Sequence, residues 1–264
     1  MTTTTAPTGA TLSMSAPTRT GWLRAFALSA RWEWASLREW AVMMVVIQFM
    51  MGVGMAIMYG FFYPELTPTT AVYITTGIPT LALIPLGFIM IPGGVGEQRM
   101  NGSFDFVWSL PVPRSAQLAA MFALYTLLSL PGTVLSLVVA AWRFGVSLDV
   151  SWLVLPAVVL AALMAVSVGS AMAFAIANPM VTNLISNALV FVVLLFSPIV
   201  YPAANLPGWL AGVHSVLPFE HMATAIRAGL TDGFVTDVGR SFVVLGAWAV
   251  AGAVITGWVA RRRG

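Results

Sequence analysis

Residues 151–176 read SWLVLPAVVLAALMAVSVGSAMAFAI, a continuous apolar stretch without an acidic or basic side chain. A helix needs about 20 apolar residues to cross the hydrocarbon core of a bilayer. The stretch lacks the alternation of apolar and polar residues that a barrel strand shows. Because backbone polar groups inside a bilayer must be satisfied within a helix or a closed barrel, the stretch predicts a transmembrane helix.

The rest of the chain has the same character. Of its 264 residues, 59% are hydrophobic and 8% are charged, and the mean hydropathy is +0.91. A soluble domain carries about a quarter charged residues. The sequence therefore predicts an all-α polytopic membrane protein with one permease domain, residues 21–264, and six spans, at 41–62, 71–92, 117–142, 151–176, 181–201 and 240–260.

The N-terminal region has two parts. Residues 1–20 are rich in Thr, Ser, Ala and Pro and predict a disordered tail. Residues 21–40 mix Trp with Arg and Glu, which predicts an amphipathic helix in the headgroup layer. A long cytosolic extension of the first span is the alternative interpretation.

Composition excludes several classes of function. The chain has no cysteine, and all 12 basic residues are arginine. Without lysine there is neither a phosphate-binding Gly-Lys-Ser/Thr loop nor a Schiff base. None of the predicted spans contains a carboxylate, which argues against a proton-coupled carrier. We therefore expect a non-catalytic membrane subunit with no metal site and no cofactor of its own.

Arginine distribution predicts the orientation. Placing both termini in the cytoplasm puts nine arginines inside and three outside, which agrees with the positive-inside tendency. The three outer ones are Arg143, Arg227 and Arg240. The expected location is the cell membrane.

The segment after the second span is the first candidate for function. Glycines 93, 94 and 96 predict a loose exit from that span, followed by a short helix from Ser103 to Leu110. Exposed aromatic side chains rimmed by charge are typical of a docking surface. Aromatic side chains that merely rest on the membrane are an equal alternative. The residues concerned are Glu97, Arg99, Asp105, Phe104, Phe106 and Trp108.

A second candidate segment, residues 202–233, lies outside between the last two spans. Pro202, Pro207 and Pro218 divide it into pieces near 206–216 and 219–230. In the second piece an apolar stripe recurs at helical spacing, and Glu220, Thr224 and Arg227 fall on another face. Pieces this short and this apolar predict a re-entrant or interfacial hairpin over the outer mouth of the bundle. The stripe consists of Phe219, Met222, Ile226 and Leu230.

Polar side chains inside the spans leave two interpretations open. Gln48, Asn183 and Asn187 lie within predicted helices, the last two four residues apart on one face. One interpretation is that these side chains line a substrate pathway. The other is that they join helices through hydrogen bonds, which is the more frequent role of such residues.

Three motifs resemble those of type-2 ABC exporter permeases, especially the daunorubicin-exporter permease group. Glu97-Gln-Arg-Met-Asn-Gly102 with Leu110-Pro-Val-Pro-Arg-Ser115 resembles the family's cytoplasmic Glu-Arg-x-x-Gly and Leu-Pro-x-x-Arg segment. Ser197-Pro-Ile-Val-Tyr-Pro202 with Leu206-Pro-Gly-Trp-Leu210 resembles the stretch after span five. Leu217-Pro-Phe-Glu-His-Met222 through Arg227 resembles its Asn-Pro-Leu region, although Leu217 stands where asparagine is common.

The resemblance implies roles for these segments. Residues 97–114 would be a coupling helix on a separate ATPase subunit, and residues 202–230 would be paired outer re-entrant helices. Two permeases, identical or related, would work with two ATPases that bind ATP and Mg. The coupling residues would be Glu97, Arg99, Gly102, Phe104, Phe106, Trp108 and Arg114, and the outer ones Pro202, Pro207, Trp209, Pro218, Glu220 and Arg227.

The expected function is export of a hydrophobic or amphipathic compound such as a drug, a natural product or a lipid-like molecule. This implies multidrug efflux and antibiotic resistance as the biological setting. A glycan or glycolipid exporter of the same class is one alternative, and a structural membrane subunit without transport activity is another.

Overall fold

The computed structural model describes residues 21–63 and 65–262, so the predicted tail, residues 1–20, lies outside the described part. Every regular element in that part is helical. The elements are α1 (Trp22–Phe62), α2 (Pro68–Pro85), η1 (Leu86–Met90), α3 (Ile91–Met100), α4 (Ser103–Ser109), α5 (Arg114–Phe144), α6 (Val154–Ala175), α7 (Pro179–Phe196), η2 (Ala203–Asn205), α8 (Gly208–His214), α9 (Pro218–Leu230) and α10 (Val238–Arg262).

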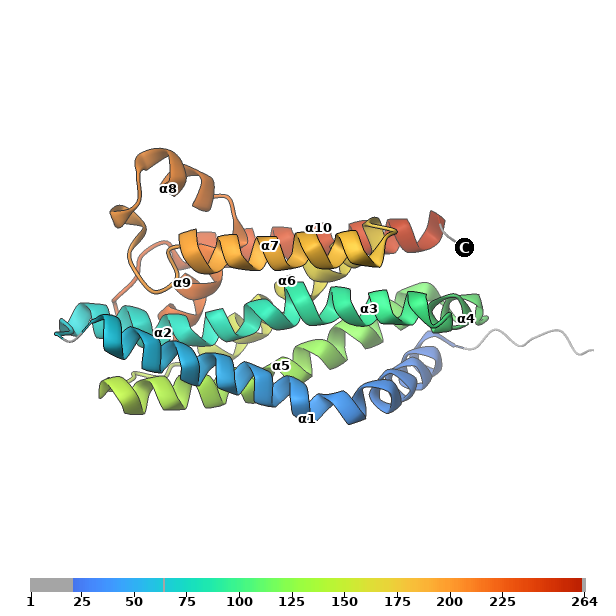
Figure 1. Cartoon of the computed structure of the whole chain (residues 1–264), viewed down its shortest axis with the longest axis horizontal. Helices are drawn as coiled ribbons and strands as arrows, with labels where there is room; N and C mark the ends of the chain where they lie inside the picture. The colour runs from blue at the N-terminus through green and yellow to red at the C-terminus, as the bar shows by residue number, and fades with distance from the viewer. Residues whose placement is uncertain (1–20, 64, 263–264) are drawn as a thin grey trace, which may run out of the picture.

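The long helices lie side by side in one elongated bundle (Figure 1). Among the described residues, six helical segments are long and apolar enough to cross a membrane, which confirms the predicted fold class. Trp22 Nε1 donates to Ser115 Oγ at 3.1 Å, and Arg114 Nη1 donates to the Ala260 carbonyl at 2.8 Å. The beginning of α1, the beginning of α5 and the end of α10 therefore meet at one end of the bundle. We call it the terminal end, and the other the opposite end.

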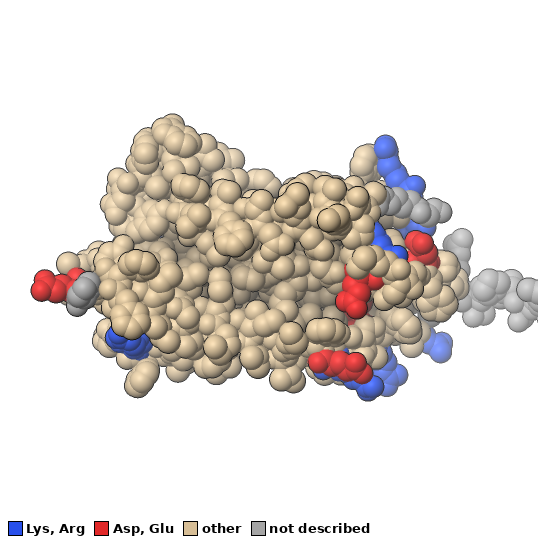
Figure 2. Space-filling model, in the orientation of Figure 1, with Lys and Arg blue, Asp and Glu red and all other residues tan. Residues whose placement is uncertain are grey.

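On the face that Figure 2 shows, charged residues gather toward the ends of the molecule. Figure 2 shows most of the acidic and basic side chains of the visible face near the terminal end, and a middle region without charge on that face. An uncharged band between charged ends matches a bilayer, in which an apolar hydrocarbon core lies between two polar headgroup layers. The long axis of the bundle therefore lies across the membrane.

Helix α1 joins two segments that the sequence separated. It is continuous over 41 residues, so the predicted interfacial helix and the first span are one helix, which changes direction along its length (Figure 1). No glycine or proline occurs between Trp22 and Met51 to end it. At 1.5 Å per residue it is roughly 60 Å long, about twice the hydrocarbon thickness. Its first turns must therefore lie outside the hydrocarbon core.

The second span is longer than predicted. The helical path continues from Pro68 through the π-helical turn η1 to Met100, so the expected loose exit at residues 93–96 is wrong. The glycines serve packing instead. A Cβ on Gly96 would lie 3.2 Å from Pro179 Cβ, so the missing side chain lets α3 approach α7 closely.

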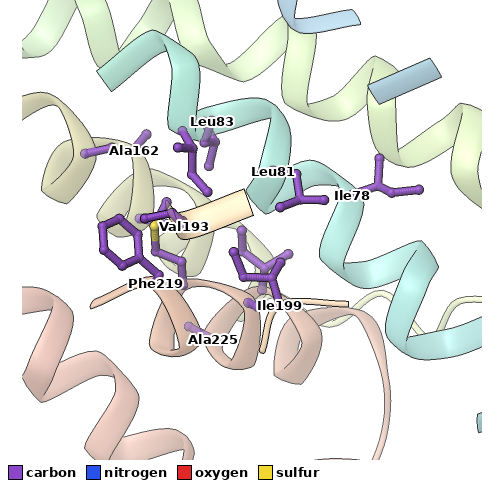
Figure 3. Close-up of a cluster of buried hydrophobic side chains, with 14 of the residues drawn as sticks. Ile78, Leu81, Leu83, Ala162, Val193, Ile199, Phe219 and Ala225 are labelled. Carbon is purple, nitrogen blue, oxygen red and sulfur yellow. The ribbon is translucent and has the colours of Figure 1, made fainter. Parts of the chain in front are cut away.

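The hydrophobic core at the opposite end is built around α2 and α9. Figure 3 shows Ile78 and Leu81 of α2 near Ile199 and the α9 residues Phe219 and Ala225. All of them are buried. Short helix α9 is therefore part of the bundle, whereas α8 projects away from it (Figure 1).

Candidate functional site

A tight turn separates α3 from the short helix α4. Gly102 adopts a φ of 75°, which glycine tolerates without the penalty of a Cβ. The Asn101 side-chain oxygen accepts a 3.0 Å hydrogen bond from the Ser103 amide. Helix α4 has seven residues and ends before Pro111. The structure thus places a short helix where the sequence predicted one, at the terminal end.

One face of α4 packs on its own bundle, which corrects the prediction that all three aromatic residues are presented to a partner. Phe104 is only 9% exposed. Its ring centroid lies 5.5 Å from that of Phe174 at the end of α6, and the Trp108 centroid lies 5.3 Å from Phe174. Burial of apolar rings is the main driving force available to hold so short a helix in place. Phe104 and Trp108 therefore anchor α4.

The other face of α4 is open. Phe106 is 57% exposed, and Asp105, Ser109 and Leu110 are also exposed. Phe106 has a ring neighbour in Trp32 of α1, at 6.3 Å between centroids. Glu97 and Met100 at the end of α3 are exposed as well. An aromatic side chain surrounded by polar and charged ones is the composition of a protein interface centre with its rim.

Arg99 connects this segment to α6. Its Nη1 donates to the carbonyl of Ile176 at 2.6 Å and to that of Ala177 at 3.4 Å, and Nη2 donates to Phe174 at 3.4 Å. These carbonyls lie at the C-terminal end of α6, where helices leave acceptors unpaired and carry negative potential. The Arg99 guanidinium also lies 4.9 Å from the centre of the Phe104 ring. A single side chain thus holds both α4 and α6.

Two further hydrogen bonds tie the segment to other helices. Arg114 Nη1 donates to the Ala260 carbonyl at the end of α10, at 2.8 Å. Gln117 Nε2 of α5 donates to the Val107 carbonyl of α4, at 3.0 Å. A displacement of α4 would therefore act on α5 through Gln117 and on α6 through Phe174.

A large cavity opens beside α4. Its volume is about 1340 Å³, and its walls come from α4, the following Pro-rich turn and the ends of α6 and α10. Arg99 and Arg114 both line it, together with Trp108 and Phe174. Helix α4 consequently touches the bundle along one face only, and space remains beside it.

The helical hairpin between the last two spans, predicted to lie outside, has nearly the bounds that the sequence predicted. Helices α8 and α9 occupy 208–214 and 218–230, and Pro218 occupies the first turn of α9, where its missing N–H costs no hydrogen bond. The apolar stripe is buried. Pro202 is half-buried, while Pro207 and Trp209 are exposed. Glu220 and Arg227 line one pocket, described below.

The three candidate pathway residues lie in different surroundings. Gln48 is buried where α1 crosses α5, against Gly132, and its backbone carbonyl accepts from Ser136 Oγ at 3.2 Å. This is a helix–helix interface. Asn187 is exposed on α7, and its Nδ2 donates to the Asn183 carbonyl at 2.8 Å. The structure does not bring the three residues together.

Sequence reasoning missed the intramolecular partners of residues 97–114, the predicted coupling segment. Phe174 and the carbonyls of Ile176 and Ala177 are about 75 residues away from Arg99 and Phe104 along the chain. Phe174 resembles any other apolar residue of a span. The one signal available was that a short turn, predicted to be cytoplasmic, follows α6 directly.

Comparison with known families agrees with this architecture. Residues 24–231, most of the chain, match the ABC-2 type transporter family. The chain belongs to that family. Such a chain is the multi-pass permease subunit of an ABC transporter; it is generally non-catalytic and normally works with an ATP-binding subunit. A search of curated proteins finds no match.

Proposed function

We propose that this ABC-2 permease exports a hydrophobic or amphipathic compound, using ATP and Mg bound to a separate subunit. The open face of α4 carries the proposal, because it is an exposed aromatic and acidic surface on a helix that packs on Phe174 of α6 and is hydrogen-bonded to Gln117 of α5. An ATPase docked there would act on the ends of α5 and α6. The direction of transport follows the resemblance to daunorubicin-exporter permeases, and so does a role in drug efflux and antibiotic resistance.

The proposed assembly contains two permeases and two ATPases in the cell membrane, with the terminal end in the cytoplasm. Large apolar side chains are exposed along α1 and α7, including Met43, Met50, Leu184 and Phe191. Such a surface suits lipid, a second permease or an apolar substrate.

The test is purification of the chain with its associated proteins in a mild detergent, followed by an ATPase assay in liposomes. Amphipathic aromatic compounds should stimulate hydrolysis several-fold, whereas an oligosaccharide should not. Stimulation by the oligosaccharide alone would favour the glycan exporter, and hydrolysis that responds to no compound would contradict a transport role.

A further inference from the structure

The opposite end contains a second, smaller pocket of about 280 Å³. It lies between α9, the loop that precedes α10 and the segment that follows α7. Its walls are unusually polar for this apolar chain, and they include Tyr73, Tyr201, Glu220, His221, Arg227 and Arg240. The volume lies at the lower end of ligand pockets, so it suits a small polar group and not a drug-sized molecule.

Arg227 is the buried cation of this pocket. It is 2% exposed, and all of its recorded hydrogen bonds go to neutral acceptors. Nε donates to Thr76 Oγ1 at 2.9 Å, and Nη2 donates to the carbonyls of Ile199 at 2.7 Å and Tyr73 at 3.4 Å. No described atom accepts from Nη1 at hydrogen-bonding distance. A buried charge normally has an opposite charge in contact, and here the structure supplies none.

A second cation, Arg240, stands on the first turn of α10. Its Nη2 donates to the Ser215 carbonyl at 3.2 Å. The same carbonyl lies 3.0 Å from His221 Nε2, and His221 Nδ1 lies 3.0 Å from Ser241 Oγ. These bonds fix the histidine ring in the wall. Because α10 begins at Val238, its positive N-terminal end adds to the potential of the two arginines.

Two carboxylates share the pocket with these cations. Glu220 lies on α9 and Asp237 precedes α10, and both line the cavity. Among the described residues, no arginine nitrogen of the pocket lies within 4.0 Å of a carboxylate oxygen. Burial lowers the pKa of Arg227 to about 10, although Tyr73 and then Glu220 raise it, so the guanidinium is charged at neutral pH. Opposite charges thus face the same space without contact.

The pocket lies at the level where the bundle meets its surroundings. The cavity is lined by Tyr73 in the second turn of α2, by Pro198 just after α7 and by Arg240 in the first turn of α10, so it lies near the ends of three helices. Tyr73 and Tyr201 line it, and tyrosine is typical of the membrane–water boundary. A ligand here would therefore be at the depth of lipid headgroups.

From this arrangement we propose that the pocket binds a zwitterion, a phosphate or carboxylate held by Arg227 and Arg240 beside an ammonium group held by Glu220 and Asp237. Phosphoethanolamine has this chemistry, either as the headgroup of a phospholipid or as a free soluble compound. The site goes beyond the proposed transport function, because it requires neither ATP nor a partner subunit.

The test measures binding to the purified full chain in detergent by its thermal shift and by calorimetry. The probes are dihexanoyl-phosphatidylethanolamine, dihexanoyl-phosphatidylglycerol, which lacks the ammonium group, and glycerophosphoethanolamine, which lacks the acyl chains. We expect the ethanolamine lipid to bind at least about tenfold more tightly than the glycerol lipid, since charge-assisted hydrogen bonds are among the strongest polar contacts. Equal affinity for glycerophosphoethanolamine identifies a soluble zwitterion as ligand, and weaker affinity identifies the lipid.

The variants Arg240→Gln and Glu220→Gln test the pocket itself, since neither side chain is fully buried. Each should weaken ethanolamine-lipid binding roughly tenfold. Arg143→Gln and Glu65→Gln are matched controls, because Arg143 lies in the last turn of α5 and Glu65 lies between α1 and α2, both outside the pocket. Both variants should bind the lipid like the unmodified chain. No detectable binding, equal binding of both lipids, or unchanged binding by both pocket variants would overturn the proposal.

Discussion

Arg99 Nη1 donates a 2.6 Å hydrogen bond to the main-chain carbonyl of Ile176, which joins the segment before α4 to the C-terminal end of α6. The same guanidinium lies 4.9 Å from the Phe104 ring centre on α4. A movement imposed on α4 from outside therefore reaches α6 through one rigid planar group. This relationship underlies the proposed coupling and can be tested by substitution.

Arg99→Lys should lower transport per ATP hydrolysed while the ATPase stays bound. Lysine keeps the positive charge but cannot span three carbonyls with a planar fork. The measurement is the ratio of transport to hydrolysis in liposomes, which we expect to fall several-fold. Arg24→Lys, an exposed arginine of α1, is the control and should leave the ratio unchanged. Equal ratios for the two variants would exclude Arg99 as the coupling residue.

The two faces of α4 should respond differently to substitution. Phe104→Ala removes a buried ring and should destabilise the isolated chain by about 3 kcal/mol, seen as a lower Tm. Phe106→Ala removes an exposed ring and should leave Tm unchanged but weaken ATPase binding at least about tenfold. The reverse assignment of the two effects would mean that the docking face has been chosen wrongly.

Close packing of α6 predicts a strong effect of one added methyl group. A Cβ on Gly169 would overlap the carbonyl of Gly87, whose carbon would lie 2.7 Å away. Gly169→Ala should therefore cost about 1–3 kcal/mol in thermal unfolding experiments. Gly246→Ala on α10 meets nothing within 4 Å and serves as the control, with an expected change of less than about 1 kcal/mol. A tolerated Gly169→Ala would show that α6 and η1 are not this close.

The orientation can be tested with single cysteines, because the chain has none of its own. Glu65→Cys lies in the exposed connection between α1 and α2, and Met100→Cys lies at the exposed end of α3. An impermeant thiol reagent should label position 65 in intact cells, and position 100 only after permeabilisation. Labelling in the opposite pattern would invert the proposed topology.

The sequence predicted the number of spans and the two short helices between the last two spans, because both depend on hydropathy and proline positions, which are local properties. It could not predict that Phe104 and Trp108 face inward. That arrangement depends on Phe174, about 70 residues further along the chain, whose position beside α4 is set by tertiary packing. Likewise, the sequence predicts that Gly96 belongs to a loop. Its role in the close packing of α3 on α7 becomes visible only when the position of Pro179 is known.

Photo-crosslinking from the open face of α4 tests the central claim most directly. In cells that express the full chain, Phe106→p-benzoylphenylalanine should crosslink to an ATP-binding protein that mass spectrometry can identify. The same substitution at Phe191, an exposed residue of α7 within a membrane span, should not crosslink to that protein. If position 106 gives no crosslink to an ATP-binding protein, or if position 191 gives the same one, α4 is not the surface on which the ATPase docks.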